Sequence, residues 1–187
     1  MTVSLAYHCL VAMPALDGTP FERSVVLICH HGQEGAGGVI LNQRLEITLA
    51  DLLMQLEMSV AAGFSKQTQL IFFGGPVNPE SGFLLHTGLQ KYAGSARIQE
   101  GLFLTASIDV LKAIAQKEGP PESMIFLGCS RWSPGQLEKE ISAHDWLVIP
   151  ASMDLIFDIP LEKRWAKAAQ RAGIANPHQL VNAVGHG

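Results

Sequence analysis

Hydrophobic positions along this chain fall in short runs, which polar and glycine-rich segments separate. Several runs are nearly continuous in Val, Ile, Leu and Phe, a pattern typical of strands that are covered on both faces. We therefore predict strands at about Leu5 to Ala12, Val25 to His31, Gly38 to Leu41, Gln69 to Phe73, Gly82 to His86, Leu102 to Thr105, Met124 to Leu127 and Trp146 to Ile149.

Between some of these strands, apolar residues recur at helical spacing. One helix is predicted after Thr48, which can cap it, with Asp51 at the third helical position of a capping box. Two more are predicted over Ile108 to Lys117 and Leu161 to Ala172, and a short turn or helix after Asn176-Pro177. The second helix is expected to turn these side chains inward: Ile108, Leu111, Ile114 and Ala115.

Many strands with only some crossover helices favour a mixed sheet or a barrel-like core over a regular doubly wound fold. The chain has 187 residues and 48% hydrophobic content, enough to bury one substantial core but not two comfortable domains. The predicted fold class is α/β (mixed α+β): a single domain over residues 1–187, with a mixed, barrel-like β core flanked by helices.

Charge and composition narrow the classes of function. With 13 basic and 17 acidic side chains the net charge is -4, so direct binding to DNA or RNA is disfavoured. No apolar run approaches the roughly 20 residues of a membrane helix, and the beginning of the chain lacks the basic region of a secretory signal. We therefore expect a cytoplasmic protein without a membrane partner. Cys9, Cys29 and Cys129 lack metal-type spacing and are expected to be buried apolar residues, not disulfides.

The segment after the predicted strand Met124 to Leu127 carries signals of a helix start. Ser133 can act as the N-cap, Pro134 suits the first helical position, and Gln136 can reach back to the cap amide. Trp132 and Leu137 can pack across this start. We expect a rigid strand-to-helix elbow. An anion site at the helix start and a protein-binding surface remain as alternatives.

A second motif, Phe73-Gly74-Gly75-Pro76-Val77, follows an apolar strand but lacks the spacing of a phosphate-binding loop. The simplest interpretation is a tight turn that lets two backbones approach closely. The alternative is a loop that lines a ligand pocket, with His86 pointing into it.

The segment from Cys29 to Gly38 contains His30 and His31, which invites a metal hypothesis. Neighbouring residues on a strand point to opposite faces, so the two imidazoles cannot share one ion without a bulge. We therefore predict no metal site and instead a hairpin, after which Asn42 ends a strand.

Cys129 and Ser130 follow a strand and precede a helix, where nucleophile elbows occur. Arg131 replaces the second glycine that such an elbow requires, and no histidine partner is evident. No catalytic residue is predicted.

Several short motifs occur together and in order. They are Met13-Pro14 with Asp17 and Phe21, His31 with Glu34-Gly35-Ala36, Gly74-Gly75-Pro76-Val77, Gly82-Phe83 with Leu85-His86, Trp132 with Gly135-Gln136-Leu137-Glu138 and Glu140, Trp146-Leu147, and Arg164-Trp165. In this combination, from about Leu10 to the Gly185-His186 end, the chain resembles the YqgE/AlgH family. The resemblance implies a single bacterial α/β domain with a barrel-like β core, outer helices and an uncharacterised activity. One branch of that family is described as a candidate transcriptional regulator of alginate synthesis.

The chain departs from the pattern of that family in two places. Where relatives tend to read Leu-Gly-Tyr-Ala-Gly-Trp, this chain has Cys129, Ser130 and Arg131 before Trp132, and it has Gln43-Arg44 where Lys/Arg-Pro is usual. A site shared by the family at Cys129 to Arg131 would be altered here.

Two functional hypotheses of different class remain. The first is a non-enzymatic regulatory or interaction protein that binds a protein partner or a small effector. The alternative is a small-molecule- or nucleotide-binding protein, or a hydrolase, with polar side chains around a pocket near the Gly-Gly-Pro turn. Neither hypothesis implies a cofactor. The candidate ligand or partner surface comprises His31, Asn42, Gly74, Gly75, Pro76, His86, Trp132, Gln136 and Glu138, with His30 as a further candidate for the pocket.

Overall fold

The computed structural model describes residues 4–88 and 92–182, so Gly185 and His186 lie outside the described residues. The strands are β1 (His8–Ala12), β2 (Val25–Gly32), β3 (Gly35–Ile40), β4 (Arg44–Thr48), β5 (Leu70–Phe73), β6 (Val77–Thr87), β7 (Ser95–Gln99), β8 (Leu102–Thr105), β9 (Ser123–Trp132) and β10 (Trp146–Pro150). The helices are α1 (Leu49–Gln55), α2 (Ile108–Ala115), α3 (Gln136–Ser142), α4 (Leu161–Arg171) and α5 (Pro177–Asn182), with a 3-10 turn at Pro14–Leu16 and a π-helical turn at Asp154–Asp158.

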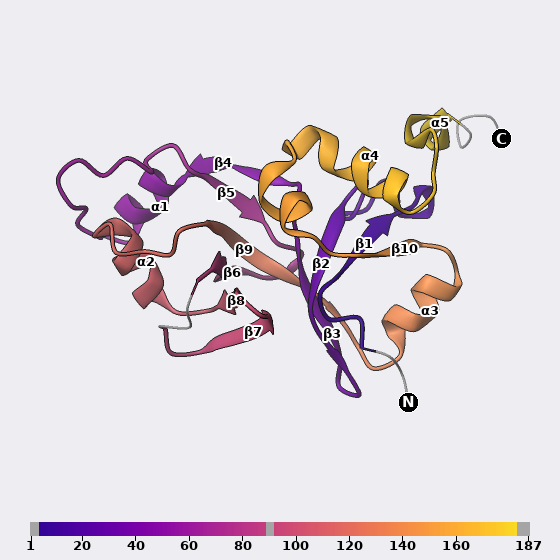
Figure 1. Cartoon of the computed structure of the whole chain (residues 1–187), viewed down its shortest axis with the longest axis horizontal. Coiled ribbons are helices and arrows are strands. Elements are labelled where there is room, and N and C mark those ends of the chain that lie inside the picture. Colours follow the sequence, from indigo (N-terminus) through magenta and orange to yellow (C-terminus); the bar gives the residue numbers. More distant parts are fainter. Residues whose placement is uncertain (1–3, 89–91, 183–187) are drawn as a thin grey trace.

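The strands form one sheet that bends around β9. Its main order is β10-β1-β2-β3-β9-β6-β8-β7, and β4 and β5 extend it as a branch from β9. The β5–β9 pair is parallel, whereas the other strand pairs are antiparallel. Strand β9 crosses the middle of the molecule and joins the half that holds β1, β2, β3 and β10 to the half that holds β4 to β8 (Figure 1). The predicted mixed α/β fold is confirmed.

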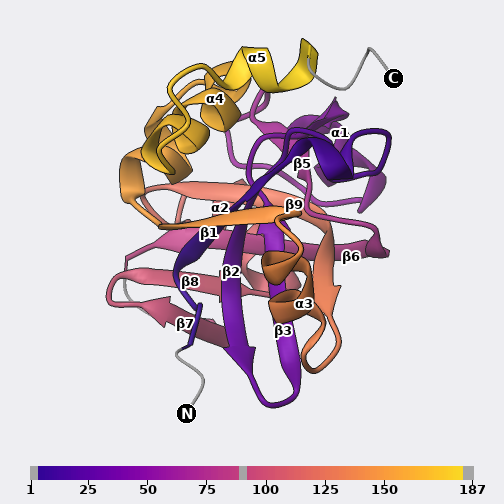
Figure 2. The same cartoon turned by 90° about the vertical axis from the view of Figure 1, so that its right-hand side faces the viewer.

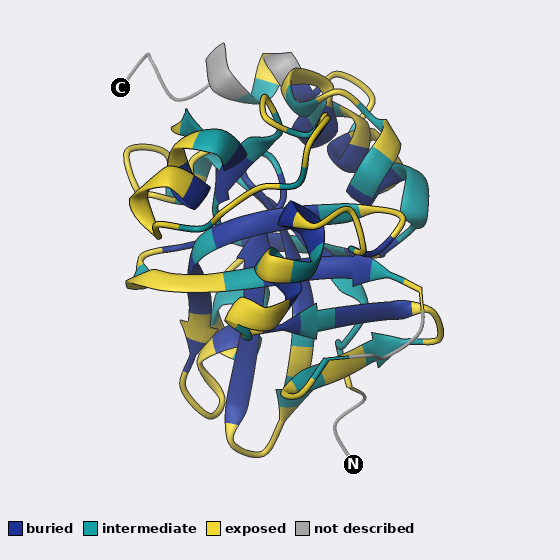
Figure 3. Ribbon diagram, turned by 90° about the vertical axis from the view of Figure 1, so that its left-hand side faces the viewer, coloured by how far each residue is buried: buried dark blue, intermediate teal, exposed yellow. Residues whose placement is uncertain are grey.

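The largest hydrophobic cluster lies between the two halves of the sheet. Leu27 of β2, Leu85 of β6 and Phe126 of β9 meet there, and Trp165 of α4 covers one side. Two smaller clusters lie under the remaining helices, one beneath α1 and α2 and one beneath α3. Figure 2 shows α3 outside the half that contains β1, β2 and β3. Buried residues follow the strands, while the loops and outer sides of the helices are exposed (Figure 3). This arrangement matches the expected β core flanked by helices.

The predicted starts of α1 and α4 are confirmed. The Thr48 side chain accepts a hydrogen bond from the Asp51 amide, and an Asp51 carboxylate oxygen accepts one from the Thr48 amide at 2.7 Å. This is the predicted capping box. Helix α4 begins at Leu161, as expected.

Two strands were not predicted from the sequence. Strands β4 and β7 lie at edges of the sheet, and most of their residues are exposed or half-buried. Their mixed polar and apolar composition hides the continuous apolar pattern on which the other strand predictions rest. In the described part of the chain, no helix is long and apolar enough to cross a membrane.

The predicted end of the strand at Leu127 is wrong, and the passage from strand to helix lies between Trp132 and Gln136. Strand β9 continues past Leu127 to Trp132, through Gly128 with a φ of 75°. A Cβ atom at Gly128 would lie 2.3 Å from the carbonyl oxygen of Gly75, so the glycine lets the two segments pass closely. Cys129 and Ser130 are therefore buried inside a strand, not placed on a turn before a helix.

Candidate functional site

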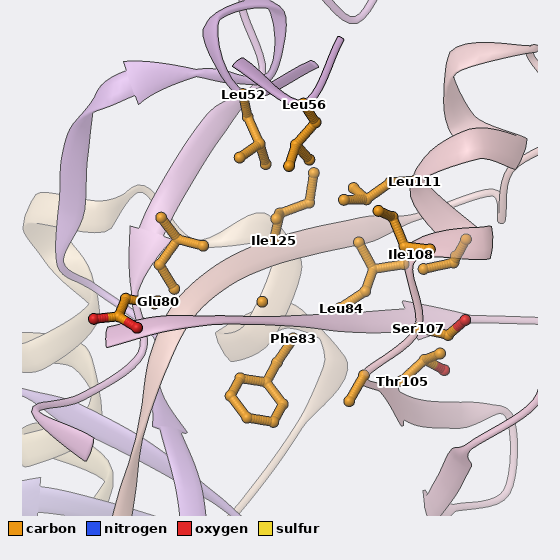
Figure 4. Close-up of a pocket in the computed structure, with 14 residues that line it drawn as sticks. Leu52, Leu56, Glu80, Phe83, Leu84, Thr105, Ser107, Ile108, Leu111 and Ile125 are labelled. Carbon is orange, nitrogen blue, oxygen red and sulfur yellow. The ribbon is translucent and has the colours of Figure 1, made fainter. Parts of the chain in front are cut away.

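A concave, largely apolar surface forms a groove between α1 and α2, above β6 and β9. It encloses about 250 Å³. Its lining comprises Leu52, Leu56, Glu80, Gly82, Phe83, Leu84, Thr105, Ala106, Ser107, Ile108, Val110, Leu111, Ile125 and Leu127. Figure 4 shows the leucine and isoleucine side chains of both helices converging over the strands.

The two helices reach the groove through ordinary amphipathic patterns. Leu52 of α1 is buried on the sheet, and Leu56 at the end of this helix is 40% exposed at the edge of the groove. On α2, Val110 and Ile114 face the core, while Ile108 is 49% exposed. The prediction that Ile108 points into the core is wrong, because this side chain lies at the exposed edge of the groove.

The groove offers little chemistry beyond apolar contact. Glu80 lies at one end, and the hydroxyls of Ser107 and Thr105 lie at the other (Figure 4). The Thr105 hydroxyl is already bonded, at 2.8 Å to His86 Nε2 and 2.5 Å to Ser95 Oγ. The arrangement suits an apolar group with a positive charge next to it.

Large apolar side chains are exposed at a few places, and two of them line this groove. Within residues 4–88 and 92–182 the exposed ones are Met54, Leu56, Val60 and Ile108. Met54 is 74% exposed on α1, and Leu56 and Ile108 line the groove itself. An apolar groove with exposed large side chains at its edge is characteristic of an interaction surface.

Among the predicted site residues, His31 and Glu138 are in contact. His31 Nε2 lies 2.9 Å from Glu138 Oε1, and His31 Nδ1 accepts a hydrogen bond from the Leu5 amide at 3.1 Å. Because Nδ1 is an acceptor, the ring proton sits on Nε2 and points to the carboxylate. The Glu138 backbone amide and His31 lower the pKa of the Glu138 carboxyl group. Both imidazole nitrogens are thus used to join the end of β2 to α3 and to the segment before β1.

Trp132 and Gln136 belong to a neighbouring network centred on Glu140. One oxygen of Glu140 accepts hydrogen bonds from Trp132 Nε1 at 2.8 Å and from Trp146 Nε1 at 2.9 Å. The other accepts from Gln136 Nε2 at 2.9 Å. Trp132 is only 5% exposed, so it contributes packing to the core under α3, not binding surface. Glu140 was not among the predicted residues, although its four-residue spacing from Gln136 is a signal for such a pair.

The start of α3 differs in detail from the prediction. Gly135, not Ser133, occupies the N-cap, with a φ of 75°. Ser133 to Gln136 form a turn closed by the Gln136 amide and the Ser133 carbonyl at 2.9 Å, which suits proline and glycine at its two central positions. Gln136 does reach back, since its Oε1 accepts from the Ser133 amide at 3.0 Å.

Gly74 and Gly75 lie against β9. The Gly74 amide donates to the Leu127 carbonyl at 2.9 Å, and the Gly74 carbonyl accepts from the Ile40 amide at 3.0 Å and from Ser130 Oγ at 3.1 Å. A Cβ atom at Gly75 would lie 2.4 Å from the Cys129 carbonyl carbon. The close approach of two backbones explains this Gly-Gly-Pro turn.

Asn42 and His86 have separate local roles. Asn42 Oδ1 accepts from the Val25 amide at 2.8 Å, and its Nδ2 donates to the Arg23 carbonyl at 2.9 Å. His86 is fully buried, bonded to Thr105 and stacked on Phe103. The structure therefore brings His31 and Glu138 together, but it does not gather them with Asn42 and His86 around the Gly-Gly-Pro turn.

The buried His86 makes stability depend on pH. Burial lowers the pKa of His86 below its usual 6.5, so near and below that pH the unfolded chain binds a proton that the folded protein does not. Stability is expected to fall as the pH drops below about 6.5, with no loss from this group above it. Urea unfolding at about pH 7.5 and 5.5 measures the change, and the loss should be smaller in His86→Gln. Equal losses in both proteins would exclude His86 as its source.

The cysteines are unsuited to nucleophilic chemistry. Burial raises the pKa values of the Cys9 and Cys29 thiols to about 12, so these groups remain protonated near neutral pH. Cys129 is buried inside β9. Within the described ranges, no three His, Cys, Asp or Glu side chains gather in a way that could hold a metal ion.

Comparison with known proteins places the chain in a family. A family model described as AlgH-like matches residues 9–177. A UPF0301 protein of Stenotrophomonas maltophilia is 44% identical over 183 residues, covering 98% of this chain and 96% of the relative. One from Saccharophagus degradans is 45% identical over 184 residues, covering 98% of this chain and 89% of the relative.

Solved structures agree with this assignment. The solution structure of the AlgH protein from Pseudomonas aeruginosa is 36% identical, has a TM-score of 0.80, and is matched over 100% of this chain and 98% of that one. A crystal structure of protein DIP2367 from Corynebacterium diphtheriae shares the fold, with a TM-score of 0.72 at 24% identity over 95% of this chain and 92% of that one. The chain therefore belongs to the AlgH-like family.

Proposed function

We propose that this protein is a non-enzymatic, cytoplasmic interaction protein that binds a partner protein through the groove between α1 and α2. The observation that carries the proposal is the position of the exposed large apolar side chains, two of which line the groove. Apolar side chains at an exposed edge are stabilised when a partner removes them from water.

The size and surroundings of the groove favour a protein segment over a small effector. Its volume of about 250 Å³ is below the roughly 300–1,000 Å³ of typical small-molecule sites. A short apolar segment that inserts a few aliphatic side chains fits this shape, as in helix-in-groove recognition. Glu80 at one end favours a partner with Lys or Arg beside those side chains.

A regulatory role fits this mode of action. The resemblance to a candidate transcriptional regulator and the net charge of -4 together favour an effect through a partner protein over direct contact with DNA. The small-effector alternative uses the same groove, because its concave apolar surface with one carboxylate is also a ligand-binding shape.

Ile108→Glu is expected to weaken partner binding at least tenfold, because a carboxylate would be buried against apolar side chains. Val60→Glu is a matched control, since Val60 is 48% exposed against 49% for Ile108 and does not line the groove. The measurement is crosslinking in cells with the wild-type protein and both variants, followed by affinity measurement with the purified partner.

The expected partner crosslinks to wild type and Val60→Glu but not to Ile108→Glu. Retention of every crosslinked protein by Ile108→Glu would refute the groove as the interface. A thermal-shift screen with small metabolites tests the effector alternative, since a ligand at 100 times its dissociation constant adds about 2.7 kcal/mol. A metabolite that stabilises Val60→Glu but not Ile108→Glu would establish that alternative in place of a protein partner.

A further inference from the structure

A second depression, of about 380 Å³, lies between β5, the start of β9 and the segment that leads into α4. Arg164 and Lys66 line it together with the aromatic side chains of Phe72 and Phe157. It shares no lining residue with the apolar groove. The charged groups distinguish it chemically from that groove.

Arg164 is an unusual residue to find in such a place. It is only 5% exposed, and its guanidinium donates from Nε to the Ile159 carbonyl at 2.8 Å and from Nη1 to the Leu41 carbonyl at 2.6 Å. Burial lowers its pKa, while Asp158 acts in the opposite direction. In the part of the chain that the structure describes, Arg164 forms no ion pair and its Nη2 has no acceptor. A guanidinium carries five N–H donors, so carbonyl bonding leaves donors for another group.

Polar residues that line the depression beside Arg164 include Lys66, Glu122 and Ser123. Lys66 adds a second positive charge, and the buried Ser123 hydroxyl has no hydrogen-bond partner among the described residues. Glu122 is the one carboxylate in the lining, against the two cations. Asp158, in the π-helical turn before α4, also acts on Arg164 from outside the lining, although it forms no ion pair with it among the described residues. A buried cation without an ion-pair partner is costly, and an anion beside it offsets that cost.

We propose that this depression binds a small organic anion, whose carboxylate or phosphate group contacts Arg164 and Lys66 and whose apolar body lies against Phe72 and Phe157. The planar guanidinium matches the oxygens of either anionic group. The aromatic side chains add contact area for the body of the ligand.

Titration with benzoate and phenyl phosphate, with benzyl alcohol as the neutral control, tests this site. The resonance of the Arg164 Nε–H group in ¹H–¹⁵N spectra reports on the guanidinium itself. At low ionic strength a saturable shift of this resonance is expected with at least one anion, and benzyl alcohol should leave it unchanged. The anion that binds with the higher affinity shows whether the site prefers a carboxylate or a phosphate group.

Lys66→Met tests the site through its second cation. Arg164 is kept, because it also donates hydrogen bonds to two backbone carbonyls and its removal risks unfolding the protein. This variant is expected to bind the preferred anion roughly two- to fivefold more weakly, as befits a partly exposed charge. Lys139→Met on α3 removes the same charge at a distant, exposed position and should bind like wild type. Absence of a saturable Arg164 shift with both anions, an equal response to benzyl alcohol, or equal weakening by Lys66→Met and Lys139→Met would overturn the proposal.

Discussion

Gly75→Ala is expected to destabilise the protein by roughly 3–5 kcal/mol. The φ of Gly75 is 146°, and a Cβ atom there would lie 2.4 Å from the Cys129 carbonyl carbon and oxygen and from Ser130 Oγ. Two of these atoms are backbone in the central strand, so they cannot move aside without disturbing β9. The measurement is the free energy of unfolding from urea denaturation.

Gly32→Ala is the control for this substitution. A Cβ atom at Gly32 meets nothing within 4 Å, and its φ lies outside the positive range that side chains rarely adopt. Its free energy of unfolding should therefore stay within about 1 kcal/mol of wild type. A loss below 1 kcal/mol in Gly75→Ala would show that the Gly-Gly-Pro turn can separate from β9 at little cost.

Glu140→Ala should cost roughly 2–4 kcal/mol, because it leaves the indole N–H groups of two buried tryptophans without their acceptor. Trp132 and Trp146 are 5% and 1% exposed, so water reaches them poorly in the folded protein. Urea unfolding followed by tryptophan fluorescence measures both the stability and the change around the two indoles.

Glu138→Ala provides a comparison on the same helix. The Glu138 side chain is 40% exposed and accepts a hydrogen bond from one other side chain, that of His31, so its loss should cost about 1 kcal/mol. Similar losses in both variants would contradict the central role assigned to Glu140 in holding α3 on the sheet.

The residues at which this chain departs from the pattern of the family, Cys129 to Arg131, lie within β9. Ser130 lies inside β9 and its hydroxyl donates to the Gly74 carbonyl, a bond that an alanine at this position cannot make. Arg131 is exposed and pairs along the backbone with Gly37 of β3. These changes affect how β9 contacts the Gly-Gly-Pro turn and β3, and they lie outside the apolar groove.

The predicted site residues and the residues of the groove differ in how far the sequence reveals them. Trp132, Gln136, Gly74 and Gly75 carry strong sequence motifs, and each supports the packing of a turn or helix in the structure. A turn or a helix start requires particular residue types at fixed positions, so these residues could be recognised in the sequence. The groove residues carry no such motif, because an exposed isoleucine and a core isoleucine look alike in a sequence.

The sequence by itself determined the mixed α/β class, the capping box of α1, the start of α4 and membership of the family, because these depend on local spacing or on ordered motifs. Only the tertiary structure decided that β9 continues past Gly128, where the strand and Gly75 must pass closely. It also decided the two concave sites. Leu56, Glu80 and Ile108 meet at the groove, and Lys66 and Arg164 at the second depression, although long stretches of chain separate them. Such sites arise from long-range strand pairing and helix packing, which no local pattern of hydrophobic residues specifies.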